Sequence, residues 1–263
     1  MDALDALRLQ LEWGADEALG EVPLDRLAAR VTTKVQPGQE TVQPAAVVRV
    51  QPASAKVQPT LATPVRRAQE VAAAARTLAE LREALSRFDG CALSTTATNL
   101  VFADGNPDAG LMLVGEGPGA EEDRAGLPFV GPSGQLLDRM LASIGLDRTQ
   151  YLITNLLPWR PPGNRNPTDS EVALCLPFLL RHIELARPRH LVLLGAMAAR
   201  AVLGGATGIT KLRGKWMQAT IPGLAEPLPT LPMLHPAYLL RNPGAKRETW
   251  ADLLLLRRTL DEF

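Results

Sequence analysis

One stretch decides the fold class of this chain: Leu111-Met112-Leu113-Val114-Gly115-Glu116-Gly117-Pro118-Gly119. Its first four residues form a short apolar run that is typical of a buried strand, and the glycines and proline that follow end the strand in a loop. Similar apolar runs recur at 151–154, 191–194 and 231–234, and helical patterns at 135–144, 168–186 and 248–260 lie between or after them. This alternation predicts an α/β fold of three layers, αβα, around a mostly parallel four-stranded sheet.

Polar side chains follow these apolar runs at the points where the strands should end. Glu116 comes after the first run, Asn155 after the second, and His235 after the last. In a sheet of this kind, ligands bind at the carboxyl ends of the parallel strands. We therefore expect these three side chains to meet in one site.

The chain divides into three parts. Residues 1–30 carry a helical pattern of leucines among frequent acids, whereas residues 31–67 repeat the triplet Val-Gln-Pro. Because prolines at this density block helices and remove backbone donors, the second part is expected to be a flexible linker. The regular pattern from 68 to 263 indicates a folded domain. The N-terminal helical segment is expected to be either a docking site for a protein partner or a flexible leftover.

Charge and composition leave the partner open. The chain carries 28 basic and 28 acidic residues, so its formal net charge is zero. Basic residues nevertheless outnumber acids between 211 and 247, which fits either a nucleic-acid surface or an ordinary solvated face. No apolar run reaches about 18 residues, the first residues are acidic where a signal peptide is basic, and the two cysteines form no disulfide framework. We therefore expect a cytoplasmic protein.

Other interpretations of the glycine-rich loop and the histidines are weaker. The loop at 115–120 fits the loose fingerprint of a dinucleotide site, but the acid about 20 residues later, Asp138, falls inside a helical pattern instead of at a strand tip. Three carboxylates at 121–123 would also face the pyrophosphate. His182 and His190 are expected to be structural. No cluster has the spacing of metal ligands, and no nucleophile elbow is present in the sequence.

Five blocks of sequence occur in order between residues 85 and 260. They are GEGPGAEED at 115–123, PFVG at 128–131, ITN at 153–155, RPPGNR at 160–165 and HPAYLLR at 235–241. This series resembles the uracil-DNA glycosylase superfamily, and family 4 within it. The resemblance identifies 68–263 as the catalytic domain of a monofunctional uracil-DNA glycosylase of base excision repair, acting as a monomer on single- or double-stranded DNA.

The resemblance implies that the target nucleotide is flipped out of the DNA and that its N-glycosidic bond is hydrolysed, which leaves an abasic site. It assigns His235, as a neutral imidazole, to donate a hydrogen bond to uracil O2. Glu116 would hold the attacking water, because Gly117 stands where the classical branch carries an aspartate. Asn155 would read the Watson–Crick edge and exclude cytosine, and Phe129 would stack on the ring.

Further contacts follow from the same resemblance. Gly117 and Glu122 are expected to line the uracil site, with Glu122 crowding C5 and rejecting thymine. Leu239 and Leu240 are expected to form an apolar wedge that fills the gap left by the flipped base. The expected DNA contacts are Ser133, Lys211, Arg213, Lys215, Tyr238, Leu239, Leu240 and Arg241. Binding to DNA would associate the cytoplasmic protein with the nucleoid.

The chain departs from family 4 at the iron–sulfur cluster that the family holds on four cysteines. Cys91 and Cys175 match two ligand positions, but Phe88 and Trp159 occupy the other two. Two thiolates cannot complete a four-cysteine site, so we expect no cofactor and no bound metal, with ring packing in place of the cluster. The loop 159–167 lacks the histidine through which a second branch traps DNA covalently.

Two functions compete with glycosylase activity. The lost cysteines also fit a protein in which the pocket persists as a non-catalytic uracil-DNA-binding module or scaffold. A nucleoside hydrolase acting on free deoxyuridine is a third candidate, but it leaves the wedge-like pair Leu239-Leu240 unexplained. Release of uracil from DNA separates these functions.

Overall fold

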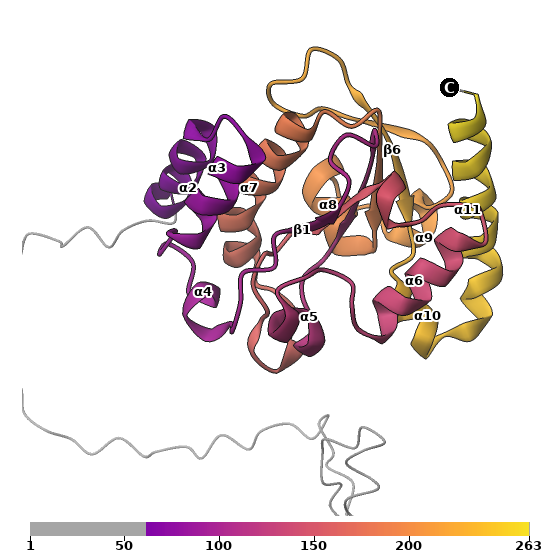
Figure 1. Cartoon of the computed structure of the whole chain (residues 1–263), viewed down its shortest axis with the longest axis horizontal. Helices are drawn as coiled ribbons and strands as arrows, with labels where there is room; N and C mark the ends of the chain where they lie inside the picture. The colour runs from indigo at the N-terminus through magenta and orange to yellow at the C-terminus, as the bar shows by residue number, and fades with distance from the viewer. Residues whose placement is uncertain (1–61, 263) are drawn as a thin grey trace, which may run out of the picture. The chain divides into compact units, whose positions relative to one another are not determined.

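The computed structural model describes residues 62–262, and this part of the chain contains a six-stranded sheet with helices on both faces (Figure 1). The strand order is β1-β3-β2-β4-β6-β5. The strands are β1 Ala103–Gly105, β2 Leu111–Gly115, β3 Leu152–Asn155, β4 His190–Leu194, β5 Met217–Ala219 and β6 Leu228–Met233. The predicted N-terminal helical segment and most of the predicted linker lie outside the described residues.

The four central strands, β3, β2, β4 and β6, are parallel to their neighbours, as the alternation of strands and helices predicts. β1 and β5 pair antiparallel at the two edges of the sheet. The sequence does not predict these edge strands, because each has three residues, and Asp104, Gly105 and Gln218 interrupt any apolar run. The expected mostly parallel sheet is confirmed, whereas the expected number of four strands is corrected to six.

The helices include three close to the predicted patterns at 135–144, 168–186 and 248–260, and several that the sequence does not predict. They are α2 Ala62–Ala74, α3 Leu78–Ser86, α4 Leu93–Thr96, α5 Ala120–Ala125, α6 Pro132–Ala142, α7 Asp169–Ala186, α8 Ala196–Leu203, α9 Ile209–Leu212, α10 Pro236–Arg241 and α11 Lys246–Asp261, with 3-10 turns η1 Arg148–Gln150, η2 Pro162–Asn164 and η3 Pro243–Ala245. Near the start of the domain, apolar side chains at helical spacing from Val71 to Phe88 predict one helix. The structure has two there, because Thr77 caps α3 by accepting the N–H of Glu80 at 3.1 Å. α2 begins at Ala62, inside the predicted linker.

Alternate side chains of the central strands face two layers of helices. Met112 and Val114 of β2 pack with α2, α3, α7 and α8, whereas Leu111 and Leu113 pack with α6 and α11 on the other face. Figure 1 shows α2, α3 and α7 side by side on one face and α6 with α11 on the other. This arrangement confirms the three layers and places the carboxyl ends of the central strands at one edge. No helix within residues 62–262 is long and apolar enough to cross a membrane.

Candidate active site

A pocket of about 320 Å³ lies at the carboxyl ends of β2, β3 and β6. Its volume falls in the range of small-molecule sites. Every residue that the sequence predicts to bind uracil or to act on it lines this pocket. The lining residues are Glu116, Gly117, Pro118, Gly119, Glu122, Phe129, Ser133, Asn155, Pro161, Asn164, Arg165, Asn166, Pro167, His235, Ala237, Tyr238 and Arg241.

Glu116 is the first residue after β2. Its backbone is held by the chain that leaves β3, because Leu157 donates its N–H to the Glu116 carbonyl at 3.0 Å. Burial raises the pKa of the Glu116 carboxyl above its usual range, and the positive charge of Arg241 opposes this rise. A half-buried carboxyl beside one cation can hold a water molecule and stabilise positive charge that develops on a ligand.

His235 connects β6 to α10 and caps that helix. Its Nδ1 accepts the backbone N–H of Ala237 at 3.1 Å. Burial, and then the nearby charge of Arg241, lower the pKa of His235 to about 4, so the imidazole is neutral at pH 7. Because Nδ1 accepts, the single proton lies on Nε2, which becomes a hydrogen-bond donor. Gly195 leaves room for this residue, since a Cβ there would lie 3.0 Å from the Cβ of His235.

Asn155 ends β3 and is the register partner of Gly115 in β2. Its Oδ1 is buried and has no hydrogen-bond partner within the described residues. Buried acceptors are nearly always paired, so an unpaired one in a pocket marks a position for a donor of a ligand. Gly115 makes room for this amide, because a Cβ at 115 would lie 2.5 Å from Oδ1 and would overlap the ring of Phe129.

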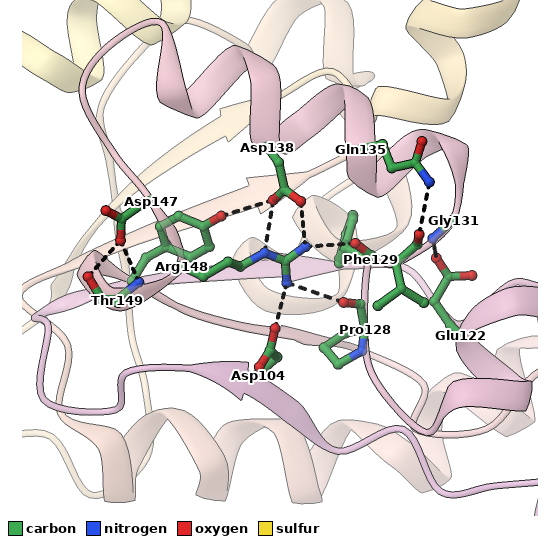
Figure 2. A network of polar contacts seen from close by, with 12 residues as sticks. Asp104, Glu122, Pro128, Phe129, Gly131, Gln135, Asp138, Asp147, Arg148 and Thr149 are labelled. Atoms are coloured by element: carbon green, nitrogen blue, oxygen red, sulfur yellow. Dashed lines mark hydrogen bonds and ion pairs between the residues drawn. The ribbon is translucent and has the colours of Figure 1, made fainter.

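Phe129 and Glu122 come from the segment between β2 and α6. The Phe129 side chain is buried, and its ring centroid lies 5.8 Å from that of His235. One carboxylate oxygen of Glu122 accepts the N–H of Gly119 at 3.0 Å. The other accepts the N–H of Gly131 at 2.8 Å, as Figure 2 shows. Glu122 therefore braces the loop that carries Phe129, and its contact with C5 of a base stays a prediction.

Six of the eight residues predicted to contact DNA are accessible. Ser133, Tyr238 and Arg241 line the pocket. Tyr238 and Leu240 expose 40% and 44% of their surface on α10. Lys211 on α9 and Lys215 just beyond it are also exposed. Their contacts with DNA stay predictions.

Leu239 is the first correction among the predicted DNA contacts. Its side chain is fully buried and packs with Leu136 of α6 and Leu234. On a helix, adjacent residues face different sides, so α10 turns Leu239 into the core while Leu240 stays exposed. An apolar wedge at this place would consist of Leu240 and not of the predicted pair.

Arg213 is the second correction. Its guanidinium donates to both carboxylate oxygens of the buried Asp252 at 2.6 and 3.0 Å, and to the backbone carbonyl of Glu248. The Arg213 side chain is 16% exposed. A bidentate pair of this kind fixes geometry, so Arg213 anchors α11 to the turn after α9 instead of meeting a phosphate.

The segment 161–167 lines the pocket, although the sequence assigns it no site residue. Arg165 in this segment donates to both oxygens of Glu171 at 2.6 and 2.9 Å, and these bonds lower the pKa of Glu171 to about 2. Asn164 and Asn166 add polar side chains beside it. The segment follows β3 at the same carboxyl edge of the sheet as Glu116. This position alone would have allowed the sequence to predict that the segment lines the pocket.

Comparison with known proteins shows the family of this chain. A model of the family described as the Uracil DNA glycosylase superfamily matches residues 102–254, more than half of the chain. The chain belongs to the uracil-DNA glycosylase superfamily.

Several curated members of the superfamily align with this chain over most of their own length. The chain is 38% identical over 182 residues to a type-4 uracil-DNA glycosylase of Pyrobaculum aerophilum, an alignment of 68% of this chain and 92% of the relative. It is 42% identical over 164 residues to the type-4 enzyme of Thermotoga maritima, with 61% and 81% covered. For the type-4 enzyme of Archaeoglobus fulgidus, identity is 41% over 166 residues, with 62% and 82% covered. The family 4-like assignment is confirmed.

In this member of the uracil-DNA glycosylase superfamily, the residues at the expected cluster positions do not fit a four-cysteine cluster. Cys91 and Cys175 are buried free thiols, and a hydrogen bond with Cys175 lowers the pKa of Cys91 to about 7. The ring of Phe88 packs edge-on against Phe178 with centroids 5.0 Å apart, and Trp159 is buried. Within the described part of the chain, no group of three or more His, Cys, Asp or Glu side chains could hold a metal ion. Apolar rings thus stand at two of the four positions.

Proposed function

We propose that this protein removes uracil from DNA by hydrolysing the N-glycosidic bond, which leaves an abasic site. The family and the type-4 relatives support the reaction class. The observation that carries the proposal is the buried, unpaired Oδ1 of Asn155, in a pocket that also holds the neutral imidazole of His235. Together they offer one acceptor and one donor to a planar ring that carries both kinds of group.

Recognition of uracil rests on Asn155. Its Oδ1 accepts the N3–H of uracil, and its amide nitrogen donates to O4. Cytosine carries an unprotonated N3 and an amino group at C4, so it would place an acceptor against Oδ1 and a donor against the amide. A base that cannot supply a donor leaves a buried acceptor unpaired, which makes the discrimination strong.

Bond cleavage rests on His235 and Glu116. As the glycosidic bond breaks, its electron pair goes to uracil, and the sugar gains oxocarbenium character. Nε2–H of His235 donates to O2, where negative charge develops. Glu116 holds the water whose oxygen bonds to C1′, accepts its proton and offsets the positive charge on the sugar. A carboxyl with a raised pKa is a better proton acceptor than an ordinary one.

The same pocket favours hydrolysis over simple binding. A non-catalytic uracil-DNA-binding protein would use Asn155 and Phe129, but it would gain nothing from a half-buried carboxyl beside the base. Glu116 lines the pocket, and burial raises its pKa. A hydrolase of free nucleosides, in turn, would have no use for the exposed Tyr238 and Leu240 next to the site.

We also propose which residues contact the DNA, that no cofactor takes part and that the protein acts as a monomer. Tyr238, Leu240, Lys211 and Lys215 contact DNA around the flipped nucleotide, and Arg241 meets a phosphate. One copy acts alone, since one chain supplies every group assigned to uracil. No iron–sulfur cluster takes part, because buried rings occupy two of its ligand positions. The protein works where the DNA is, in the cytoplasm at the nucleoid.

Incubation of the purified protein, without added metal, with an oligonucleotide that carries one uracil tests this function. We expect release of free uracil and cleavage of the strand at that position by alkali. A matched oligonucleotide with cytosine should stay intact. Glu116→Gln should keep its mobility shift with the uracil strand while release slows about a hundredfold or more. A wild-type protein that binds the strand and leaves uracil in place would make it a binding protein instead.

A further inference from the structure

We propose that Arg148 is a positioning residue for uracil binding, because its guanidinium holds the backbone of Phe129 in the conformation that places the ring in the pocket. Arg148 is not among the residues that line the pocket. It lies in η1, just before β3 and 19 residues after Phe129. The inference rests on the proposed function, in which Phe129 stacks on the base.

Phe129 has a backbone conformation that needs support. Its φ is 57°, in the left-handed region that residues with a side chain rarely adopt. Such a conformation persists only where the surrounding structure holds it. Here it places the buried ring against Gly115 and 5.8 Å from His235. A return of φ to negative values would move the ring away from both.

The guanidinium of Arg148 contacts this backbone directly (Figure 2). Nη2 donates to the Phe129 carbonyl at 2.7 Å, and Nη1 donates to the Pro128 carbonyl at 3.3 Å. Nε and Nη2 donate to the two oxygens of Asp138 at 2.8 and 3.2 Å, and Nη1 donates to Asp104 at 3.0 Å. Two carboxylates from separate elements, α6 and β1, thus orient the planar group toward the two carbonyls.

The loop around Phe129 is also held from its other end. The N–H of Gly131 donates to Glu122, and Gly134 lets α6 approach, because a Cβ there would overlap the carbonyl of Phe129. These contacts limit where the loop can go. Arg148 is the side chain that bonds the Phe129 carbonyl itself, so it bears on the φ and ψ of that residue most directly.

Only arginine can make this set of contacts. Lysine has a single nitrogen and cannot serve two carboxylates and two carbonyls in one plane. The Arg148 side chain is 25% exposed, so its removal also leaves Asp138 and Asp104 without their cation in a partly desolvated place. A loss of stability is therefore expected in any variant, and the test has to separate it from an effect on the base.

The affinity for uracil separates an effect on base binding from a general loss of stability. In Arg148→Met we expect the KM for the uracil oligonucleotide and the inhibition constant of free uracil to rise about tenfold, with a smaller fall in the single-turnover rate. Arg148→Lys should lie between this variant and the wild type. Arg181→Met is the matched control, because Arg181 also donates to a backbone carbonyl, that of Ala75 at 2.6 and 2.9 Å, and pairs with Glu184 outside the pocket. It should lower Tm and leave KM unchanged.

A double-mutant cycle with Phe129→Ala tests the route of the effect. If Arg148 acts through the ring, Arg148→Met should change KM little once the ring is gone, so the two effects do not add. Additive effects, or wild-type KM and uracil inhibition in folded Arg148→Met, overturn the inference. If Arg148→Met does not fold, the same constants are measured in Arg148→Lys and Asp104→Asn. A wild-type KM and a wild-type inhibition constant of uracil in both variants overturn the inference. A wild-type protein that releases no uracil overturns the proposed function itself, and this inference with it.

Discussion

Nδ1 of His235 accepts the backbone N–H of Ala237 at 3.1 Å, so the ring proton lies on Nε2 of a neutral imidazole. His235→Ala should slow uracil release by about 10²- to 10³-fold, the usual effect of removing one donor to a developing anion. His235→Gln keeps an amide N–H and should retain more activity than the alanine variant. Single-turnover release at saturating protein measures both. An alanine variant as fast as wild type would show that His235 does not meet O2.

The acid limb of the pH profile should respond to Arg241. In the proposed mechanism Glu116 works as a carboxylate, so activity should fall as the pH drops through its raised pKa. The charge of Arg241 opposes that rise and also lowers the pKa of His235. Arg241→Gln should therefore raise both pKa values and move the acid limb to higher pH, measured as the single-turnover rate at saturating DNA. Lys246→Gln, at an exposed position on α11, is the control and should leave the limb in place.

The carboxylate that we propose holds the water should still function when it is moved from position 116 to position 117. A Cβ at Gly117 would meet Leu157 at 3.5 Å, an ordinary contact, so an aspartate fits there. Glu116→Gln combined with Gly117→Asp should recover at least about tenfold of the rate lost in Glu116→Gln alone, because a carboxylate returns to the pocket. The isosteric pair Glu116→Gln with Gly117→Asn should recover nothing. Equal rates in the two double variants would contradict the role of the charge.

Stability should fall on mild acidification because of His182. This buried ring stacks on Phe102 with centroids 4.6 Å apart, and burial lowers its pKa to about 4, against about 6.5 in an unfolded chain. Between these pH values the unfolded state binds a proton that the folded state does not. The free energy of unfolding should thus fall as the pH drops from about 6.5 to 4, by on the order of 1 kcal/mol per pH unit.

His182→Phe keeps the aromatic stack and removes the titrating group. Urea unfolding should therefore show a weaker pH dependence for this variant than for the wild type in the same window. Above about pH 7 the histidine is neutral in both states, so the pH dependence of the two proteins should agree there. Identical slopes below pH 6 would show that His182 takes up its proton without cost in the folded state.

The purified protein should contain no stoichiometric iron. Only two cysteines exist in the chain, and buried rings occupy the other two predicted ligand positions. Protein purified without oxygen should lack absorbance near 400 nm, and elemental analysis should find far less than one iron per chain. Uracil release should be unaffected by an iron chelator. Four irons per chain would show that other ligands complete a cluster.

The central sheet and the set of residues at its edge could be predicted from the sequence. Four short apolar runs gave β2, β3, β4 and β6, since burial on both faces removes polar residues from such strands. Chain direction then brings Glu116, Asn155 and His235 to one edge. This part of the site follows from local patterns and from the parallel rule.

Contacts between distant segments could not be predicted in the same way. Arg213 and Asp252 lie 39 residues apart, and nothing in either neighbourhood indicates the pair. The burial of Leu239 depends on which side of α10 meets α6, which a six-residue helix does not reveal. Arg148 bonds backbone carbonyls, and every residue has a carbonyl, so this contact leaves no trace in the side-chain pattern.

Gly115 lies against both of the groups that we propose identify the base. Its missing side chain is the space shared by the Phe129 ring and the Asn155 amide. One added methyl group would compete with both at once, so stacking and edge recognition cannot be tuned separately at this position. In the proposed mechanism, selectivity for the base would thus depend on a glycine that contributes only the absence of a side chain.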